Sequence, residues 1–356
     1  MKRSLLFEPV KLGKLWLPNG VLMAPLTRLR AEADGTPGEM IAKYYEQRAS
    51  AGLIISEMTV VSAKGQAYLN APGMYTEGHR KGWRRVTDAV HGAGGRIFSQ
   101  LAHAGRISHP SLLPGGAIPV GASAVRPAGH VHTRSGSQPY VTPRALEIGE
   151  IGGVVKEFAD AARMAMEAGF DGVELHSANG YLLDQFLRDG TNWRQDGYGG
   201  PAKGRARLLL EVVEAVTEVW GAGRVGVRLS PFNGFNDMSD TNPRETFTVA
   251  AEALSGRGLA YLHIFEPVQE AWLTPRLRQA FGGALVVNGG FDVETGNAVV
   301  EGRSADAVAF GVPFLANPDL PERLRAGLPL NRPDPTTFYT GGARGYIDYP
   351  VHSPIV

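Results

Sequence analysis

The sequence predicts a closed (β/α)₈ barrel of eight parallel strands, and three observations lead to this fold class. Short apolar runs alternate with longer segments whose apolar residues recur every three or four positions, as in strands followed by amphipathic helices. Eight such units fit in order along 356 residues, a length that suits one large α/β barrel. No Gly-x-Gly-x-x-Gly turn follows the first strand, which argues against the alternative of a doubly wound open sheet.

The expected elements follow the chain in alternation. The strands are expected at Gly20–Leu26, Leu53–Thr59, Arg96–His103, Asp171–His176, Arg224–Ser230, Leu259–Phe265, Ala284–Asn288 and Ala305–Phe310. The main helical patterns are Gly38–Ser50, Arg80–Gly92, Glu150–Ala168, Arg205–Trp220, Arg244–Leu254 and Val293–Glu301. We expect one domain over residues 1–356.

Two segments fall outside this repeat. Leu5–Leu17 alternates in hydrophobicity and predicts a hairpin that closes the bottom of the barrel. Residues 104–146 form an insertion after the third strand, and their middle part, His109–Pro143, is rich in Gly, Pro, Ser and His and too polar for core. Because such long insertions are usually functional or disordered, we expect a lid or small subdomain over the substrate end of the barrel.

Composition excludes several classes of function. The 36 basic and 35 acidic residues leave a formal net charge of +1, so neither nucleic acid nor an anionic membrane is expected as a partner. The absence of cysteine excludes disulfides, thiolate catalysis, iron–sulfur clusters and thiolate zinc sites. Met1-Lys2-Arg3 is followed by a short apolar stretch that Glu8 and Pro9 break, so we expect no signal peptide. A cytoplasmic location is compatible with these features.

Three polar residues follow the fourth predicted strand at its carboxyl end. His176 and Asn179 carry N–H donors that could meet at one point, and two such donors suit a carbonyl oxygen on which negative charge develops. Tyr181 adds a weak acid that could protonate a neighbouring carbon. The pattern therefore points to reduction of a C=C bond conjugated to a carbonyl or nitro group. The alternative is that His176 and Asn179 only cap the next helix or satisfy loop backbone.

The other strand ends extend this candidate site. Strands seven and eight end in Asn288-Gly289-Gly290 and Phe310-Gly311, in the two loops where barrels commonly bind phosphate. Glycine there lets backbone N–H groups approach phosphate oxygens closely. The remaining strand-end residues are Ala24, Pro25, Leu26, Thr27, Ser56, Glu57, Met58, Thr59, Gln100, His103 and Arg228. Together these positions predict a planar, phosphate-bearing ligand across the barrel mouth.

Five sequence blocks resemble the old yellow enzyme family of FMN-dependent ene-reductases, nearly from end to end of the chain. The block His176-Ser177-Ala178-Asn179-Gly180-Tyr181 is highly specific in its place after a strand. The others are Ala24-Pro25-Leu26-Thr27-Arg28, Gln100-Leu101-Ala102-His103-Ala104-Gly105-Arg106, Gly311 with Ala316-Asn317-Pro318-Asp319-Leu320, and Gly345-Tyr346-Ile347-Asp348-Tyr349-Pro350. The resemblance implies FMN as the cofactor and NADPH or NADH as the reductant in a ping-pong scheme.

The resemblance also implies a role for each matching residue. Thr27 is expected to bond the flavin near O4, Gln100 to bond its pyrimidine edge, and Arg228 to face N1 and O2. His176 and Asn179 would bind the activating oxygen of an α,β-unsaturated carbonyl, maleimide or nitro-compound. Hydride would pass from FMN N5 to the β-carbon and a proton from Tyr181 to the α-carbon. The further implied flavin contacts are Ala24, Pro25, Leu26, Met58, Asn288, Gly289, Gly290, Phe310 and Gly311, and the further implied substrate contacts are Tyr68, Ala102 and Tyr339.

Several positions depart from the family pattern or select within it. Thr27 stands where the thermophilic-like branch has Cys, so the chain resembles the classical-type branch, which includes N-ethylmaleimide reductase-like enzymes. Val312 replaces the usual Arg beside the FMN phosphate, and losing one charge-assisted hydrogen bond of roughly 1.5–3 kcal/mol could weaken FMN binding about tenfold to a hundredfold. Ala102 replaces a frequent Trp, which predicts a wider pocket, and Met58 replaces a frequent Ala, which refills part of it.

Two rival classes of protein stay open at this stage. A metal-dependent barrel lyase or aldolase could use Glu174, His176 and His103 as ligands. A flavin-binding regulator without turnover is the other, although it would need no proton donor such as Tyr181. For the reductase we expect a small electrophilic alkene as substrate, no bound metal, and a monomer or homodimer.

Overall fold

The computed structural model of the protein describes residues 4–352. Residues 1–3 and 353–356 lie outside the described residues. The first of these ranges is part of the segment on which the signal-peptide expectation rests. Within residues 4–352 no helix is long and apolar enough to cross a membrane.

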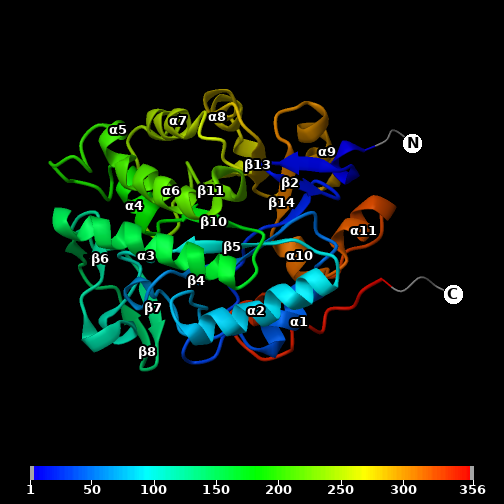
Figure 1. Cartoon of the computed structure of the whole chain (residues 1–356), viewed down its shortest axis with the longest axis horizontal. Helices are drawn as coiled ribbons and strands as arrows, with labels where there is room; N and C mark the ends of the chain where they lie inside the picture. The colour runs from blue at the N-terminus through cyan, green and yellow to red at the C-terminus, as the bar shows by residue number, and fades with distance from the viewer. Residues whose placement is uncertain (1–3, 353–356) are drawn as a thin grey trace.

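Eight parallel strands close into a barrel, which confirms the predicted fold class (Figure 1). In barrel order the strands are β3 (Val21–Met23), β4 (Ile54–Val60), β5 (Ile97–Ala102), β10 (Gly172–Ser177), β11 (Val225–Leu229), β12 (Tyr261–Phe265), β13 (Leu285–Asn288) and β14 (Ala307–Phe310). The helices are α1 (Glu39–Glu46), α2 (Glu77–Gly92), α3 (Ile148–Glu167), α4 (Leu182–Leu187), α5 (Ala202–Arg205), α6 (Arg207–Trp220), α7 (Pro243–Leu254), α8 (Thr274–Phe281), α9 (Val293–Glu301), α10 (Val312–Ala316) and α11 (Leu320–Ala326).

The strands are buried on both faces, which explains why they appear as continuous apolar runs. All seven residues of β4 and all six of β10 are buried. The outer faces pack on the helices, as where Val173 joins Val154 and Phe158 of α3 in one apolar cluster. A barrel interior is filled by side chains, so neither face of a strand meets water.

The predicted N-terminal hairpin is present and closes one end of the barrel. Its strands, β1 (Val10–Leu12) and β2 (Leu15–Leu17), pair antiparallel, and three of its leucines pack against interior residues such as Phe98 and Val286. Gly13 at the turn has a φ of +55°, and a Cβ there would lie 2.3 Å from the carbonyl oxygen of Gly223. The turn therefore requires glycine for both its conformation and its close approach to the barrel.

The insertion after β5 lies at the opposite end of the molecule from this hairpin (Figure 1). It contains an antiparallel ladder of β7 (His130–Thr133) with β8 (Gly136–Pro139), and a short parallel pair of β6 (Val120–Gly121) with β9 (Arg144–Ala145). The expectation that the segment is too polar for core was wrong in part. Val131 and Tyr140 are buried in an apolar cluster that also contains Tyr181. Successive side chains of β7 alternate between exposed and buried positions, so part of this polar segment is buried. Composition alone does not show such alternation. The role of a lid stays a prediction.

Element boundaries differ from the predicted ones where local chemistry intervenes. The first strand ends at Met23 rather than Leu26, and Pro25 lacks the N–H that a strand ladder needs. The helix expected at Arg205–Trp220 is broken at Ala206 into α5 and α6. α2 begins three residues before the predicted Arg80, because the Thr76 hydroxyl accepts from the His79 N–H at 3.1 Å and caps it. The helices that we did not name, α4, α8, α10 and α11, have at most eight residues, too few for a clear helical period.

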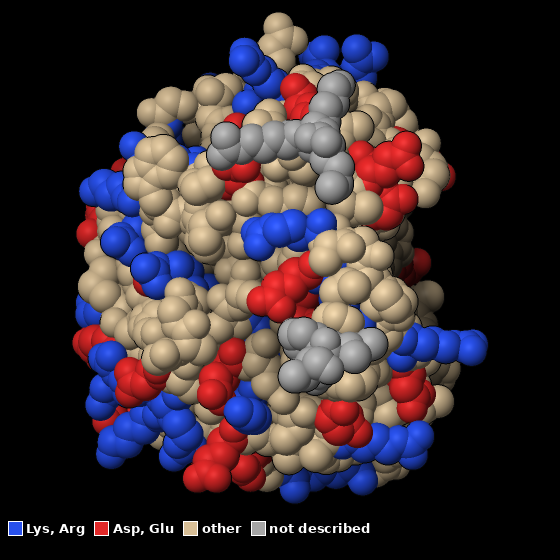
Figure 2. Space-filling model, turned by 90° about the vertical axis from the view of Figure 1, so that its right-hand side faces the viewer, with Lys and Arg blue, Asp and Glu red and all other residues tan. Residues whose placement is uncertain are grey.

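Charged side chains of both signs are interspersed over the face of the molecule that lies on the right-hand side of Figure 1 and faces the viewer in Figure 2. The view shows no field of a single sign on this face. This distribution agrees with the near-neutral formal charge of +1.

An arginine–tyrosine clamp, formed by Arg28, Arg48, Tyr44 and Tyr346, holds the C-terminal segment against α1. The Tyr44 and Tyr346 rings stack with centroids 4.1 Å apart, and the Arg48 guanidinium carbon lies 3.8 Å from the Tyr44 centroid. Arg48 donates to the carbonyls of Phe314 at 2.9 Å and Leu315 at 2.6 Å. Arg28, directly after Thr27, donates to the carbonyls of Phe338 and Gly345. The clamp thus fixes the segment that carries Phe338 and Tyr339.

We predict that Arg48→Met lowers the free energy of unfolding by about 3 kcal/mol. At least two buried carbonyls lose their donors, and each such loss costs roughly 1–3 kcal/mol. The matched control is Arg144→Met, which removes an exposed arginine paired with Glu150 and should cost less than about 1 kcal/mol. Urea unfolding followed by circular dichroism measures both. Equal losses in the two variants would contradict the role of the clamp.

Candidate active site

The barrel register brings the predicted polar residues together at the carboxyl ends of neighbouring strands. His176 on β10 is paired with Arg228 on β11, which is paired in turn with His263 on β12. Two residues before His176 on β10, Glu174 pairs with Gln100 on the other neighbouring strand, β5. Residues more than 150 positions apart in the chain, such as Gln100 and His263, therefore belong to one polar site.

Tyr181 follows directly after the β10 loop and lies between another tyrosine and a histidine. Its hydroxyl is 3.0 Å from that of Tyr68, and its ring centroid is 4.9 Å from that of His176. Burial raises the pKa of Tyr181 to about 12, and burial also holds the pKa of Tyr68 well above its ordinary value. Both phenols are therefore protonated at neutral pH, and Tyr181 retains a proton that it can donate.

His176 is buried at the end of β10 and is neutral. Burial, followed by the charges of Arg228 and His263, holds the pKa of His176 well below its ordinary value. A neutral imidazole carries one N–H donor and one acceptor nitrogen. Its Nδ1 is buried without a hydrogen-bond partner among residues 4–352. A buried polar atom of this kind calls for a ligand group or an ordered water.

Asn179 lies in the left-handed region, with a φ of +56°, which asparagine tolerates better than most residues. Its backbone N–H donates to Ser230 Oγ at 2.8 Å, and its carbonyl accepts from Asn236 Nδ2 at 2.8 Å. Asn233 Nδ2 donates to its side-chain oxygen, also at 2.8 Å. The loop after β11 thus supports Asn179 at three points, and no residue among 4–352 engages the Asn179 Nδ2.

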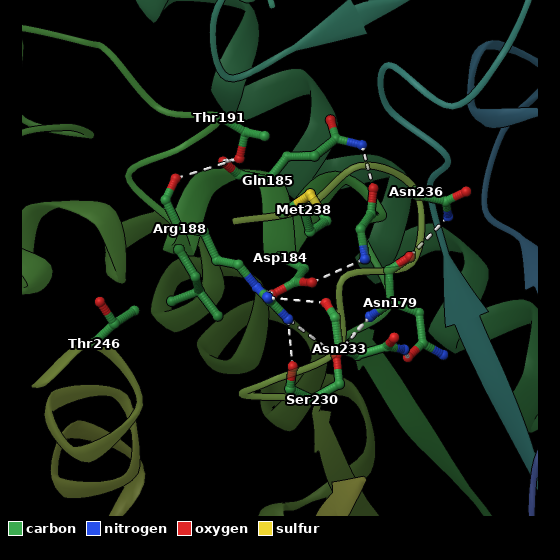
Figure 3. Close-up of polar contacts among 12 residues, drawn as sticks. Asn179, Asp184, Gln185, Arg188, Thr191, Ser230, Asn233, Asn236, Met238 and Thr246 are labelled. Carbon is green, nitrogen blue, oxygen red and sulfur yellow. Dashed lines mark hydrogen bonds and ion pairs between the residues drawn. The ribbon is translucent and has the colours of Figure 1, made fainter. Parts of the chain in front are cut away.

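A buried ion pair on α4 joins these two loops (Figure 3). Arg188 Nε donates to Asp184 Oδ1 at 2.9 Å, and both side chains are at most 2% exposed. Asp184 Oδ2 accepts from the Gly180 N–H at 2.8 Å, while Arg188 donates to the backbone carbonyls of Asn233 and Ser230. Removing one partner of such a pair leaves a buried charge uncompensated, so α4 ties the β10 loop firmly to the β11 loop.

Arg228 supplies a buried cation at the strand ends. Its Nη2 donates to Asn288 Oδ1 at 2.9 Å, and Asn288 Nδ2 donates to the Ala309 carbonyl at 2.7 Å. Its Nε is buried without a partner among residues 4–352. Burial lowers the pKa of Arg228, but the nearby Glu174 charge raises it, and the guanidinium stays charged at neutral pH. An unmet cationic donor suits the electron-rich edge of a flavin.

Gln100 and Glu174 belong to a buried hydrogen-bond network below this edge. Glu174 accepts from Gln100 Nε2 at 2.8 Å, Tyr261 Oη at 3.1 Å and His263 Nδ1 at 2.8 Å. Burial acts to raise the pKa of Glu174, but the charges of His263 and Arg228 and the hydrogen bonds from His263 and Gln100 outweigh it and lower that pKa. Because Gln100 turns its amide nitrogen to Glu174, its oxygen is free to accept from a ligand N–H.

The ligand set of the rival metal enzyme is not assembled. Both oxygens of Glu174 already accept hydrogen bonds within the barrel, and His103 Nδ1 accepts from the Gly105 N–H at 3.0 Å. Among residues 4–352, no three His, Asp or Glu side chains are grouped so that they could hold a metal ion. Glu174 thus works as a hydrogen-bond acceptor of the barrel interior, a role that alternation along one strand does not reveal.

The glycine loops after β13 and β14 have the backbone that close approach to a phosphate requires. Gly289 has a φ of +144° and Gly290 a φ of +85°, both accessible to glycine at little cost. A Cβ at Gly290 would meet no atom within 4 Å, so the backbone there is open. Gly311 precedes α10, and Val312 beside it is 39% exposed. These residues fit the phosphate of the implied FMN, with no cation at position 312.

The remaining predicted residues lie around this mouth with different exposure. Pro25, Leu26 and Thr27 are half-buried, and the buried Ala24 donates its N–H to the Phe310 carbonyl at 3.0 Å. Met58 and Ala102 are buried in the same apolar cluster as Tyr181. Tyr339 is 60% exposed, although its phenol is near enough to raise the pKa of Tyr68 and Tyr181.

Sequence reasoning missed the residues that support the site. These are Tyr140 from the insertion, Ser230, Asn233 and Asn236 from the loop after β11, and the Asp184–Arg188 pair. Asn233 and Asn236 follow the strand-end Arg228 closely, and this spacing could have indicated that they belong to the site. Nothing in the sequence indicated Tyr140, because the insertion that contains it has no clear helix or strand periodicity.

Comparisons with known proteins agree with this geometry. The sequence profile of the NADH:flavin oxidoreductase / NADH oxidase family matches residues 5–331. A probable flavin mononucleotide-dependent alkene reductase of Leishmania infantum is 44% identical over 98% of this chain and 97% of its own. 12-Oxophytodienoate reductase 2 of Arabidopsis thaliana is 42% identical over 97% of this chain and 95% of its own.

Solved structures of similar proteins match this fold over nearly the whole chain. Morphinone reductase in complex with tetrahydroNAD superposes with a TM-score of 0.96 and 48% identity, covering 99% of both chains. The old yellow enzyme homologue from Zymomonas mobilis superposes with a TM-score of 0.94 and 43% identity, covering 97% of this chain and 99% of its own.

We predict that Val312→Arg tightens FMN binding by about tenfold, because it places a cation beside the phosphate loops. Val312→Met adds bulk without charge and should leave the affinity unchanged. Isothermal titration of the apoprotein with FMN, at low and high salt, measures both. The gain should shrink at high salt. Equal affinity in all three proteins would mean that backbone N–H groups suffice.

Proposed function

We propose a reaction for this chain from the premise that it belongs to the NADH:flavin oxidoreductase / NADH oxidase family, and within it to the old yellow enzymes. It is an FMN-dependent oxidoreductase whose reductant is a nicotinamide. The proposed reaction is reduction of the C=C bond of an α,β-unsaturated carbonyl, a maleimide or a nitroalkene. Bound FMN would supply the hydride-transfer chemistry between the nicotinamide and the β-carbon of the alkene.

The electrophile is polarised by two donors from the β10 end. The neutral His176 offers one N–H, and Asn179 offers the amide N–H that its neighbours leave free. Two hydrogen bonds to the carbonyl or nitro oxygen stabilise the negative charge that develops there during hydride arrival. Since both donors are held by buried surroundings, little reorganisation is needed at that moment.

Tyr181 is the proposed acid for the α-carbon. With a pKa raised by burial to about 12, it keeps its proton over the whole physiological range. The Tyr68 hydroxyl, 3.0 Å away, can donate to the Tyr181 oxygen once that oxygen has lost its proton. The observation that carries the proposal is this arrangement of an acid beside two donors, since a flavin-binding regulator would need none of it.

The cofactor is held by groups whose geometry fits a flavin. Arg228, with its unmet Nε, would stabilise the negative charge that a flavin gains on reduction, and the Gln100 oxygen would accept a ring N–H. The backbone at Gly290, where an added Cβ would meet no atom within 4 Å, would hold the phosphate together with Gly311. An anaerobic stopped-flow experiment tests the proposal as a whole: NADPH or NADH should bleach the flavin, and cyclohexenone should restore its colour.

We predict that Tyr181→Phe slows cyclohexenone reduction by the prereduced enzyme by roughly 10²–10⁴-fold, while a quinone, which needs no protonation at carbon, is spared. The matched control is Tyr198→Phe, a tyrosine that pairs with Glu211 on α6. Stopped-flow absorbance of the flavin gives both rates. If the quinone and cyclohexenone slow equally, Tyr181 is not the acid.

The pH dependence of the same step is a separate prediction. Because the pKa of Tyr181 is raised to about 12, the acid stays protonated, and the rate with cyclohexenone should be flat between about pH 6 and 10. The rate should fall only as the pH approaches the raised value. A fall centred near pH 10 would indicate an acid in an ordinary aqueous environment.

Ala102 is proposed to widen the pocket beside Tyr181, since both belong to one apolar cluster. We predict that Ala102→Trp reduces turnover of 3-methylcyclohexenone at least about tenfold more than that of cyclohexenone, because the added ring occupies the space of the β-substituent. NADPH oxidation with a small maleimide should continue. Equal loss for small and large alkenes would indicate misfolding or a displaced flavin rather than a narrowed pocket.

A further inference from the structure

The side-chain amide of Asn179 has only one of its two ends engaged by the protein. Asn233 Nδ2 donates to Asn179 Oδ1 at 2.8 Å, and both residues are labelled in Figure 3. The Asn179 Nδ2 has no hydrogen-bond partner among residues 4–352. The two ends of an amide have nearly the same shape, but one donates and the other accepts. Which end meets a substrate is therefore decided by the partner of the other end.

The polarity of that partner is itself fixed by a backbone group. Asn233 Oδ1 accepts from the Phe235 N–H at 3.0 Å. A backbone N–H can only donate, so the end of Asn233 that faces it must be the oxygen. The nitrogen of Asn233 then faces Asn179 and can only meet an oxygen there. One peptide group in the loop after β11 thus sets the direction of two consecutive side-chain amides.

The backbone around Asn233 is held in place by buried groups. Arg188 Nη1 donates to the Asn233 carbonyl at 3.0 Å, and Arg188 is paired with Asp184, which in turn accepts from the Gly180 N–H. The Asn179 N–H and carbonyl are bound by Ser230 and Asn236. These contacts fix the backbone positions from which the two side-chain amides meet.

We propose that Asn233 is a positioning residue that makes Asn179 present an N–H, rather than an oxygen, to the electron-withdrawing group of the substrate. The proposal rests on the proposed function, in which Asn179 binds a carbonyl or nitro oxygen. With the opposite orientation, the lone pairs of the Asn179 oxygen would face the substrate oxygen, and attraction would become repulsion. Asn233 would then determine that the site selects hydrogen-bond acceptors.

Asn233→Asp tests this, because it keeps the shape of the side chain and its bond to the Phe235 N–H but loses the donor. The introduced carboxylate can only accept, so the Asn179 amide should turn its nitrogen to it and its oxygen to the substrate. The enzyme is photoreduced without NADPH and mixed anaerobically with cyclohexenone. We expect the rate of flavin reoxidation to fall on the order of 10²-fold, the typical effect of losing one such donor.

Two further measurements separate positioning from a structural effect. The dissociation constant of the unreactive ketone cyclohexanone, read from the flavin spectrum of the oxidised enzyme, should rise at least tenfold. Asn242→Asp is the matched control: it adds the same charge on the same loop, and its oxygen still accepts from the Glu245 N–H to cap α7. This control should bind cyclohexanone and reduce cyclohexenone as the parent does.

A double-mutant cycle with Asn179→Ala gives the decisive outcome. If Asn233 acts through Asn179, adding Asn233→Asp to Asn179→Ala should change the reoxidation rate less than twofold. Additive effects of the two substitutions would overturn the proposal, as would a parental rate in Asn233→Asp alone. Failure of the proposed function gives a different result, because Asn179→Ala alone would then reduce cyclohexenone at the parental rate.

Discussion

The parallel register of the closed barrel is the constraint on which the site depends. Because all eight strands run the same way, every strand ends at one mouth, and the register pairs His176 with Arg228 across β10 and β11. A shift of one residue in either strand would send these side chains to the opposite face of the sheet. The hairpin β1–β2 packs its leucines against interior residues and closes the other end of the barrel. The site is therefore confined to the end where the strands terminate.

Buried polar networks, rather than exposed ion pairs, hold the site in shape. Glu174 accepts hydrogen bonds from Gln100, Tyr261 and His263 in the barrel interior. The Asp184–Arg188 ion pair joins the loops that follow β10 and β11. Buried charges are costly to desolvate, but once every partner is present the cost of breaking the network is high. These networks act together with the apolar cluster that contains Met58, Ala102 and Tyr181 to hold the loops of the mouth.

The same networks determine the direction of hydrogen bonding at the mouth. The side-chain amides of Gln100 and Asn179 each have one end engaged by the protein: the nitrogen of Gln100 by Glu174, and the oxygen of Asn179 by Asn233. The free ends are therefore an acceptor at Gln100 and a donor at Asn179. In the reaction that we propose, the acceptor at Gln100 would meet a ring N–H of the flavin, and the donor at Asn179 would meet the oxygen of the activated alkene.

The sequence by itself determined the barrel, its hairpin and the composition of the mouth, because strand and helix periods are local and the strand-end residues are read directly from the chain. It placed His176, Asn179, Tyr181, Arg228 and Gln100 at strand ends, where the structure has them. The tertiary structure alone decided their partners. Tyr140 comes from an insertion without periodicity, Glu174 is engaged by three residues on two other strands, and Asn233 meets Asn179 across 54 positions of chain. Hydrogen-bond polarity, burial and raised pKa values depend on which distant segments come together, and no local pattern in the sequence encodes that.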